Sequence, residues 1–305
     1  MTAPKPVTFL SQSISISANL YPPPPSAPNR KGAAIVVSHP FGGVKEQTAG
    51  LYASLLAEQG FTTLAFDAAY QGASGGEPRY LEDPYQRAED IKSAVTFLST
   101  LDNIDKARIG ALGICASGGY VPFAAQTDRR IKAVATISAA DTGRLFREGL
   151  GTTLGREDLM KQLEAAGEDR IKEAQGQKPH LEHIVPHTMS EIPAGTPTLY
   201  AEGTNYYRTP RAQHKNSPNL YIFGSVDRLA TYSSYAFVDM IAPHPLLMIV
   251  GEKADTLYFS EYAIKAAKEP KELFVVKGMT HIDLYDQPDG VMLKLVEFME
   301  KYLAA

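Results

Sequence analysis

The sequence predicts an α/β protein built on a doubly wound, mostly parallel sheet, with an N-terminal antiparallel edge hairpin and a mainly helical cap insertion. Two observations support this fold class. Continuous apolar runs of strand length recur along the chain, and helical patterns lie between most of them. Strands that alternate with helices in this way form a parallel sheet with helices on both faces.

The elements follow in chain order. Alternating apolar and polar residues at 7–10 and 13–20 predict the edge hairpin. The apolar runs that predict strands buried on both faces are 33–37, 63–66, 109–112, 133–137, 246–250 and 273–276. The helical patterns between and after them cover 47–58, 85–101, 120–126, 260–267 and 290–303.

The alternation stops between about residues 141 and 242. That stretch is too long for an ordinary connection, and it contains few clear strands and one amphipathic, charged helix at about 156–175. We therefore expect a core made of residues 1–141 and 243–305, with residues 142–242 forming a cap over the carboxyl edge of the sheet.

Composition limits the function classes. The chain has 305 residues, of which 44% are hydrophobic and 21% charged, and a net charge of −4 is too small to suggest nucleic acid or a membrane surface as partner. It shows no export segment and no membrane span. One cysteine cannot form an internal disulfide, which fits a cytoplasmic location. No phosphate-binding or dinucleotide-binding glycine pattern is present, so we expect no cofactor, and we expect no metal.

The single cysteine lies in Gly113-Ile114-Cys115-Ala116-Ser117-Gly118-Gly119, directly after an apolar run. The pattern predicts a strand, a sharp turn with Cys115 at its apex, and a helix. Small neighbours permit the strained turn, and the N–H groups and dipole of the following helix favour a thiolate. The alternative is a small, buried apolar cysteine without chemistry.

Polar residues follow three further predicted strands. His39 follows the first, Asp255 follows the strand at 246–250, and His281 follows the strand at 273–276. Ligands bind at the carboxyl ends of strands in such sheets. Nucleophile, acid and histidine in this chain order resemble the α/β-hydrolase superfamily, and the cysteine resembles its dienelactone-hydrolase-like branch. The segments at 72–79, 206–211 and 245–255 are also similar to a fungal polyketide transferase of this fold.

The resemblance gives each residue a role with a physical reason. His281 would accept the thiol proton and later protonate the leaving group. Asp255 would orient the imidazole, with Asp141 as the alternative acid because it also follows a predicted strand. The backbone N–H groups of Ala116 and Phe41 would stabilise the oxyanion.

Four other features are assigned structural roles. His39 is expected to brace its loop by hydrogen bonding, and Asp67 to organise backbone after its strand. Ser117 lies past the apex and should face away from His281, so it is not expected to be the nucleophile. Proline interrupts the spacing of His180, His183 and His187, which predicts a solvated loop rather than a metal site.

The expected function is hydrolysis of an ester, thioester or lactone through Cys115, His281 and Asp255, without a cofactor. An acyltransferase that uses the same residues and a non-catalytic binding protein are the alternatives. The substrate is expected to be a small acyl compound. Four cap residues are candidates to contact it, namely Tyr206, Tyr207, Arg208 and Arg211. The alternative is that these four residues only pack within the cap. The resemblance also allows a homodimer.

Overall fold

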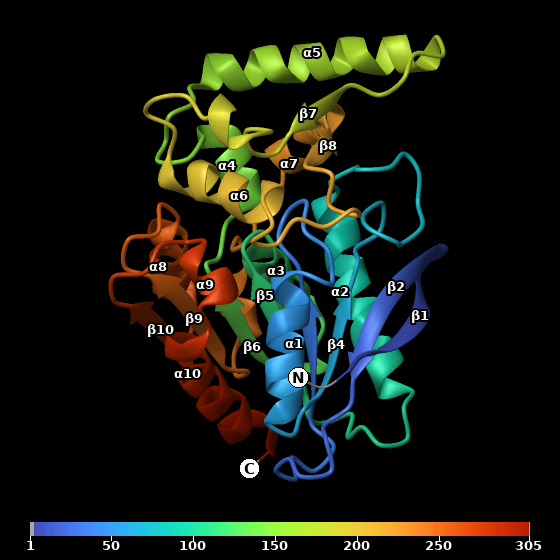
Figure 1. Cartoon of the computed structure of the whole chain (residues 1–305), viewed down its shortest axis with the longest axis vertical. Helices are drawn as coiled ribbons and strands as arrows, with labels where there is room; N and C mark the ends of the chain where they lie inside the picture. The colour runs from blue at the N-terminus through green and yellow to red at the C-terminus, as the bar shows by residue number, and fades with distance from the viewer. Residues whose placement is uncertain (1–2, 305) are drawn as a thin grey trace.

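The computed structural model describes residues 3–304. Within them, eight strands form one sheet in the order β1-β2-β4-β3-β5-β6-β9-β10 (Figure 1). The six strands from β4 to β10 are parallel, while β2 pairs antiparallel with both β1 and β4. This confirms the predicted fold class, including the edge hairpin. The strands are β1 (Lys5–Ser11), β2 (Ile14–Tyr21), β3 (Ala34–Ser38), β4 (Thr62–Phe66), β5 (Ile109–Ile114), β6 (Ile131–Ile137), β9 (Leu246–Gly251) and β10 (Lys271–Val276).

Helices cover both faces of the sheet. Successive strand residues point to opposite faces, so Val36 packs into the core beneath one helical layer and Val37 into the core beneath the other. The first layer contains α2 (Pro84–Ser99), α3 (Ser117–Thr127) and α8 (Leu257–Ala266). The second contains α1 (Thr48–Glu58), α9 (Asp283–Asp286) and α10 (Asp289–Met299). No helix among the described residues combines the length and the apolar composition needed to cross a bilayer.

Two elements differ from the sequence prediction. Helix α3 begins at Ser117, three residues before the predicted start, because the turn at Cys115 leads directly into the helix. Its small residues permit close packing, since a Cβ on Gly118 would lie 2.6 Å from Cα of Ala139. Strand β10 is an edge strand rather than a strand buried on both faces, and Val275 is 43% exposed there.

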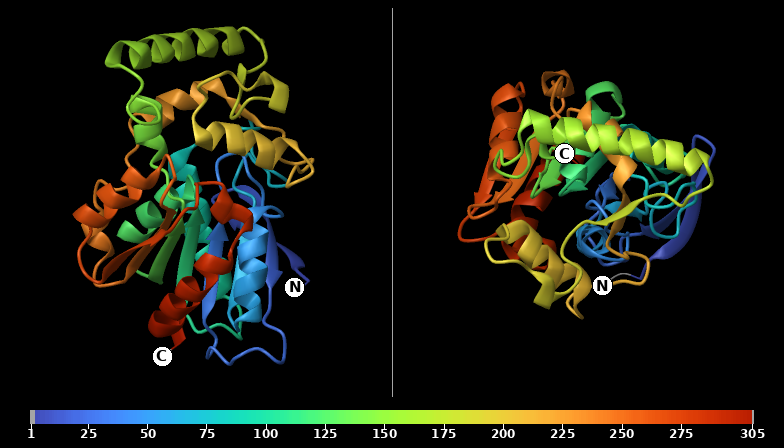
Figure 2. Two further views of the ribbon diagram at one scale, coloured as in Figure 1. Left: turned by 60° about the vertical axis from the view of Figure 1, so that its left-hand side comes forward. Right: turned by 90° about the horizontal axis from the view of Figure 1, so that it is seen from above.

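Residues 142–242 are mainly helical. The long helix α5 lies across the top of the molecule, with α4, α6 and α7 between it and the sheet (Figures 1 and 2). Its bounds, Arg156–Ala174, agree closely with the predicted charged helix. A two-stranded antiparallel pair, β7 with β8, was not predicted. The elements are α4 (Thr142–Glu148), α5, β7 (Leu181–His183), η1 (Met189–Glu191), α6 (Thr198–Arg208), β8 (Leu220–Ile222), η2 (Phe223–Ser225), α7 (Val226–Ala230) and η3 (Val238–Ile241).

Polar contacts join this segment to the loops at the carboxyl edge of the sheet. The amide of Gln47 donates to the carbonyl of Ala212 at 2.7 Å, and the hydroxyl of Ser217 donates to the carbonyl of Gly42 at 2.6 Å. The segment therefore lies over the edge at which the predicted site residues converge. The division into a core of 1–141 and 243–305 and a cap of 142–242 stays a prediction, and "cap" below means residues 142–242.

Candidate active site

Cys115 occupies the turn between β5 and α3. Its φ is +56°, a left-handed conformation that residues other than glycine rarely adopt. The turn is so tight that a Cβ on Gly113 would overlap the carbonyl oxygen of Ser117. A strand, a strained turn and a helix in this order present the side chain at the carboxyl edge of the sheet, at the N-terminus of α3. Cys115 therefore lies where an elbow of this kind holds its nucleophile.

Hydrogen-bond donors surround the Cys115 sulfur. The backbone N–H groups of Ala116 and Phe41 and the hydroxyl of Tyr285 lie beside it, and each lowers the pKa of the thiol. The residue is partly exposed because it faces a cavity, yet burial of the thiol raises its pKa and exceeds the opposite effect of these donors. The thiol is therefore neutral at neutral pH, with two backbone donors beside it.

His281 follows β10 and is buried, with an exposed fraction of 1%. Its Nδ1 lies 2.6 Å from Oγ1 of Thr256, and its Nε2 lies 3.2 Å from Oη of Tyr285. Burial lowers the pKa of His281 to about 3, so the imidazole is neutral. The Tyr285 hydroxyl, which is hydrogen-bonded to the imidazole, also lies beside the Cys115 thiol in the lining of the same cavity.

The two predicted acids do not contact the His281 ring, and this corrects the expected triad geometry. The Asp255 carboxylate accepts the backbone N–H of Leu199, at 2.8 Å, in the first turn of α6. Asp141 accepts the backbone N–H of Arg144, at 3.1 Å, and so caps α4. Free N–H groups at a helix start are strong partners for a carboxylate, which explains why both acids turn towards the cap. A neutral hydroxyl takes the position expected for the acid.

His39 and Ser117 occupy a buried network beneath the Cys115 turn. The His39 ring lies 2.7 Å from the carbonyl of Pro40 through Nδ1 and accepts the backbone N–H of Ala68 at Nε2, at 3.0 Å. Arg87 donates to the His39 carbonyl at 2.9 Å, and the Ser117 hydroxyl donates to the same carbonyl at 2.5 Å. These are the contacts of a bracing histidine and a structural serine, and they fix the loop that leads into the Phe41 donor.

The four residues predicted to contact substrate separate in the structure. Tyr207 lines the cavity at Cys115, whereas Tyr206 packs behind it, with its ring edge-on to that of Tyr285. Arg208 donates to the carbonyl of His187 at 3.3 Å. Arg211 forms a bidentate ion pair with Asp286, both distances being 2.7 Å. Three of the four therefore make structural contacts in this conformation, because α6 turns only one of its faces towards the cavity and Arg211 lies beyond the end of the helix.

Two adjoining cavities lie between the cap and the sheet edge. The inner one, of about 60 Å³, contains Cys115, Ala116 and Tyr285 on the core side. The outer one, of about 350 Å³, extends towards α5. No charged side chain of residues 3–304 lines either cavity. Four residues line both, namely Phe41, Leu145, Ile184 and Tyr200.

The cap also touches the donor loop directly. Gly42, next to the Phe41 donor, has a φ of +68°, and a Cβ on it would collide with the side chain of Ile184. Glycine is required there by both conformation and space. The loop that carries one backbone donor and the cap side chain that lines both cavities are therefore in van der Waals contact.

Sequence reasoning missed Thr256 and Tyr285. Tyr285 is four residues after His281, a spacing that places two side chains on one face of a helical turn, and this was the available signal. Thr256 immediately follows Asp255 and carried no signal of its own. A difference of one residue in the loop after β9 decides which side chain faces the ring, and a sequence pattern does not determine it.

The remaining sequence features have structural contacts. The Asp67 carboxylate accepts hydrogen bonds from the ammonium group of Lys45, at 2.7 Å, and from the backbone N–H of Lys45, at 2.8 Å. These contacts agree with the expected role of Asp67 in holding the backbone after its strand. His180 pairs with Asp169 at 2.8 Å. Among residues 3–304, no group of three or more histidine, cysteine or acidic side chains is arranged to hold a metal ion.

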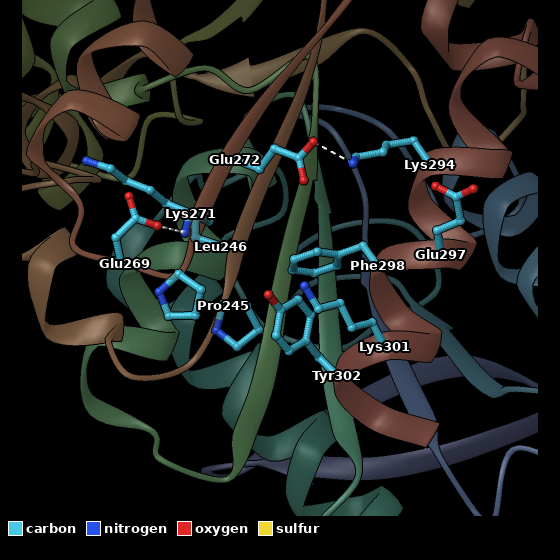
Figure 3. Close-up of a pocket in the computed structure, with 11 residues that line it drawn as sticks. Pro245, Leu246, Glu269, Lys271, Glu272, Lys294, Glu297, Phe298, Lys301 and Tyr302 are labelled. Carbon is cyan, nitrogen blue, oxygen red and sulfur yellow. Dashed lines mark hydrogen bonds and ion pairs between the residues drawn. The ribbon is translucent and has the colours of Figure 1, made fainter. Parts of the chain in front are cut away.

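A separate surface cleft of about 390 Å³ lies between β10 and α10 (Figure 3). Its lining carries three acidic and three basic side chains, and Glu272 pairs with Lys294. The charges balance, and the described lining holds neither cysteine nor histidine. This cleft is therefore not a candidate for acyl chemistry.

The profile of the Alpha/beta hydrolase family matches residues 30–292. The chain belongs to this family. The uncharacterized protein YcjY of Escherichia coli (strain K12) is 41% identical over 275 residues, which cover 90% of this chain and 89% of YcjY. The crystal structure of the hypothetical protein PA2218 from Pseudomonas aeruginosa superposes with a TM-score of 0.92 at 37% identity, covering 98% of this chain and 94% of PA2218.

More distantly similar proteins carry enzyme names. Polyketide transferase grgF of a Penicillium species is 26% identical over 286 residues, covering 90% of each chain. The crystal structure of GrgF superposes with a TM-score of 0.81 at 24% identity, covering 99% of each chain. Thiohydrolase aneE of Aspergillus aculeatus is 25% identical over 280 residues, which cover 90% of this chain and 86% of aneE. The predicted similarity to a fungal polyketide transferase is confirmed.

Proposed function

We propose that this chain is a cofactor-independent hydrolase that cleaves an ester, thioester or lactone through a thioester formed on Cys115. The observation that carries the proposal is the pair of backbone N–H groups, from Phe41 and Ala116, that both reach the same sulfur. A carbonyl carbon bonded to that sulfur would place its oxygen beside the two donors, where they would stabilise the developing oxyanion. Family members named for acyl transfer and thiohydrolase activity support the same chemistry.

The catalytic cycle uses this chain's residues alone. The Cys115 sulfur attacks the carbonyl carbon as His281 takes up the thiol proton, and the oxyanion is held by Phe41 and Ala116. Collapse of the tetrahedral intermediate breaks the bond to the leaving group, which receives the proton from His281. Water, deprotonated by His281, then attacks the thioester and releases the acid and Cys115. In this scheme Thr256 orients the imidazole in place of a carboxylate.

The cavities support an uncharged substrate with an apolar acyl group. Leu145, Ile184 and Tyr200 continue from the inner cavity into the outer one, so an acyl chain bound to Cys115 would extend beneath α5. Burying each methylene there contributes about 0.8 kcal/mol to binding. Membership of the dienelactone-hydrolase-like branch belongs to the same proposal, since it rests on a cysteine nucleophile at position 115. The cytoplasmic location and the homodimer stay predictions.

A second candidate function is acyl transfer to an alcohol, amine or thiol. The inner cavity favours it, because about 60 Å³ lined by apolar and aromatic side chains leaves little room for an ordered water beside an acylated Cys115. The thioester would then persist until an acceptor bound. A relative named a polyketide transferase supports this alternative as well.

The test uses activated aryl esters with acyl chains of two to eight carbons, and follows release of the aryl alcohol with and without an acyl acceptor. The wild type is compared with Cys115→Ala, and Ser117→Ala is the matched control for the neighbouring hydroxyl. Mass spectrometry after an acid quench locates the acyl group. We expect it on Cys115 in the wild type and in Ser117→Ala.

Each outcome decides between the functions. Turnover without acceptor that disappears in Cys115→Ala establishes a hydrolase, and one equivalent of product followed by acceptor-dependent turnover establishes a transferase. Equal turnover in Cys115→Ala overturns the assignment of the nucleophile. The absence of an acyl-enzyme across the whole series favours a non-catalytic binding protein.

A further inference from the structure

The thiol and the imidazole of the candidate site are joined through a third group. Among residues 3–304, the hydrogen-bond partners of the His281 ring are Thr256 at Nδ1 and Tyr285 at Nε2. The Tyr285 hydroxyl also lies beside the Cys115 sulfur, and both residues line the inner cavity. A proton that leaves the thiol for the imidazole therefore meets a phenolic oxygen first.

Tyr285 is held rigidly in this position. Its ring is 1% exposed and lies edge-on to the ring of Tyr206, with centroids 5.1 Å apart. The hydroxyl of Thr48 donates to the Tyr285 carbonyl at 2.9 Å, and the hydroxyl of Tyr52 donates to the Leu284 carbonyl at 2.6 Å. Ring and backbone are both fixed, so withdrawal of the side chain to permit direct contact would break buried packing.

The hydrogen-bonding capacity of the three groups suits a directed chain. A phenolic hydroxyl donates one hydrogen bond while it accepts another. With Nε2 of His281 as acceptor, the ring proton resides on Nδ1. The Nδ1–H group then donates a hydrogen bond to Oγ1 of Thr256, which holds the ring in this tautomer. Tyr285 then donates to Nε2 and accepts the S–H of Cys115.

We propose that Tyr285 is a catalytic residue that relays the proton between Cys115 and His281. The inference rests on the proposed function. As the sulfur bonds to the acyl carbon, the S–H bond breaks and its proton passes to Oη of Tyr285, while the original phenolic proton passes to Nε2 of His281. One S–H and one O–H bond break, one O–H and one N–H bond form, and Tyr285 is neutral before and after.

The return step follows the same path in reverse. When the tetrahedral intermediate collapses, Tyr285 gives its proton to the departing oxygen or sulfur and takes the proton from Nε2 of His281. The leaving group departs neutral and the imidazole returns to its resting form. In this scheme Tyr285 is the group nearest the reacting atoms, and His281 acts through it.

The surroundings fit a relay that forms charge only transiently. Burial lowers the pKa of His281 to about 3, raises that of Cys115 and raises that of Tyr285, so all three groups are neutral at rest. A permanent thiolate and imidazolium pair would be disfavoured here. The oxyanion, once held by its two backbone donors, supplies the negative charge that stabilises the protonated imidazole.

The test is Tyr285→Phe, which retains the ring and its packing and removes only the hydroxyl. Tyr232→Phe is the matched control, because Tyr232 is also fully buried and its hydroxyl donates to the backbone carbonyl of Gly119, at 3.4 Å. Stopped-flow measurement of aryl alcohol release gives the acylation rate constant in H₂O, in D₂O and in mixtures of the two. We expect Tyr285→Phe to lower this constant by about 100-fold or more, the scale of lost proton-transfer catalysis, and Tyr232→Phe to change it by less than about threefold.

The solvent isotope dependence separates a relay from a positioning effect. Two protons move together in the wild type, so its rate constant should depend on the deuterium fraction as a curve, and a residual single transfer in Tyr285→Phe should give a straight line. A Tyr285→Phe variant that acylates within threefold of the wild type with the same isotope dependence overturns the relay.

A second readout does not depend on the acyl chemistry. When the thiol ionises, the phenolic O–H turns from Nε2 of His281 to the sulfur and stabilises the thiolate, so Tyr285→Phe should move the alkylation of Cys115 by iodoacetamide to higher pH. An unmoved profile contradicts contact between Tyr285 and the thiol and overturns the relay. If the wild type forms no acyl-enzyme but the alkylation profile moves, the proposed function fails while the contact that carries the relay stands.

Discussion

The hydroxyl of Thr256 lies 2.6 Å from Nδ1 of His281 and takes the position in which sequence reasoning placed a carboxylate. A threonine can fix the orientation of the ring, but it brings no negative charge. Burial lowers the pKa of His281 to about 3, and no carboxylate lies against the ring to oppose this effect among residues 3–304. The site at rest consists of a neutral thiol, a neutral phenol and a neutral imidazole.

The first prediction compares Thr256→Val with Asp255→Asn. Loss of the Thr256 hydroxyl frees the imidazole, and a hydrogen bond worth about 1.4 kcal/mol corresponds to an acylation rate lowered by about 10-fold. Asp255→Asn should lower the acylation rate by less than about threefold. It should lower the thermal midpoint of unfolding, because the Asp255 carboxylate accepts the backbone N–H of Leu199 in α6. Single-turnover kinetics and thermal unfolding of both variants check this. A larger kinetic loss in Asp255→Asn than in Thr256→Val would restore Asp255 as the orienting acid.

The second prediction concerns the pH dependence of Cys115. Burial raises the pKa of its thiol above the ordinary value of 9.0, so the reactive thiolate forms only at higher pH. The second-order rate constant for alkylation by iodoacetamide should rise with pH through an inflection above 9. Cys115→Ser provides the unreactive reference, since the chain has no second cysteine. An inflection near neutral pH would instead reveal a stabilised thiolate.

The third prediction concerns stability and His281. In the unfolded chain a histidine binds a proton below about pH 6.5, whereas the buried ring resists it down to about pH 3. Below pH 6.5 the unfolded state therefore binds more protons, and this group makes the fold less stable as the pH falls. His281→Gln removes the effect. The difference in the free energy of unfolding between wild type and His281→Gln should therefore change with pH. As the pH is lowered from 6.5 to 4, the wild type should lose about 1.4 kcal/mol per pH unit relative to the variant. A difference that does not change with pH would contradict a neutral, buried His281.

The fourth prediction concerns the path from the inner to the outer cavity. Ile184→Trp should obstruct it, because Ile184 lines both. We expect kcat/KM for an eight-carbon ester to fall by about 10-fold or more beyond the loss seen with the acetyl ester, since each methylene excluded from the cavity loses about 0.8 kcal/mol. Ile171→Trp, on the exposed side of α5, is the control. Equal losses for short and long chains would show that acyl groups do not bind there.

The sequence predicted those parts of the molecule that depend on periodicity. The parallel strands, the hairpin and α5 all follow from local patterns of apolar residues, and the turn at Cys115 follows from its small neighbours. The placement of the Phe41 and Ala116 backbone beside Cys115 follows from the path of the chain, and their role as oxyanion donors stays a prediction.

Side-chain choices within loops could not be predicted in the same way. Asp255 and Thr256 are adjacent, and the start of α6, more than fifty residues earlier in the sequence, attracts the carboxylate and leaves the hydroxyl for His281. The choice between substrate contact and cap packing for Tyr206, Arg208 and Arg211 was left open for a related reason, since the rotation of α6 about its axis and the path of the chain after it decide which side chains meet the cavity. Both outcomes depend on tertiary contacts that no local window contains.

The contact between Gly42 and Ile184 links two properties of the candidate site, the shape of the cavity wall and the position of the donor loop. Ile184 belongs to the wall that a substrate chain would touch, and Gly42 belongs to the loop that would hold the oxyanion donor. A bulkier or smaller side chain at position 184 changes the packing against that loop as well as the shape of the cavity wall. Variants selected at this position for a new acyl chain would inherit an altered rate for every substrate, and recovery would require a second change in the loop.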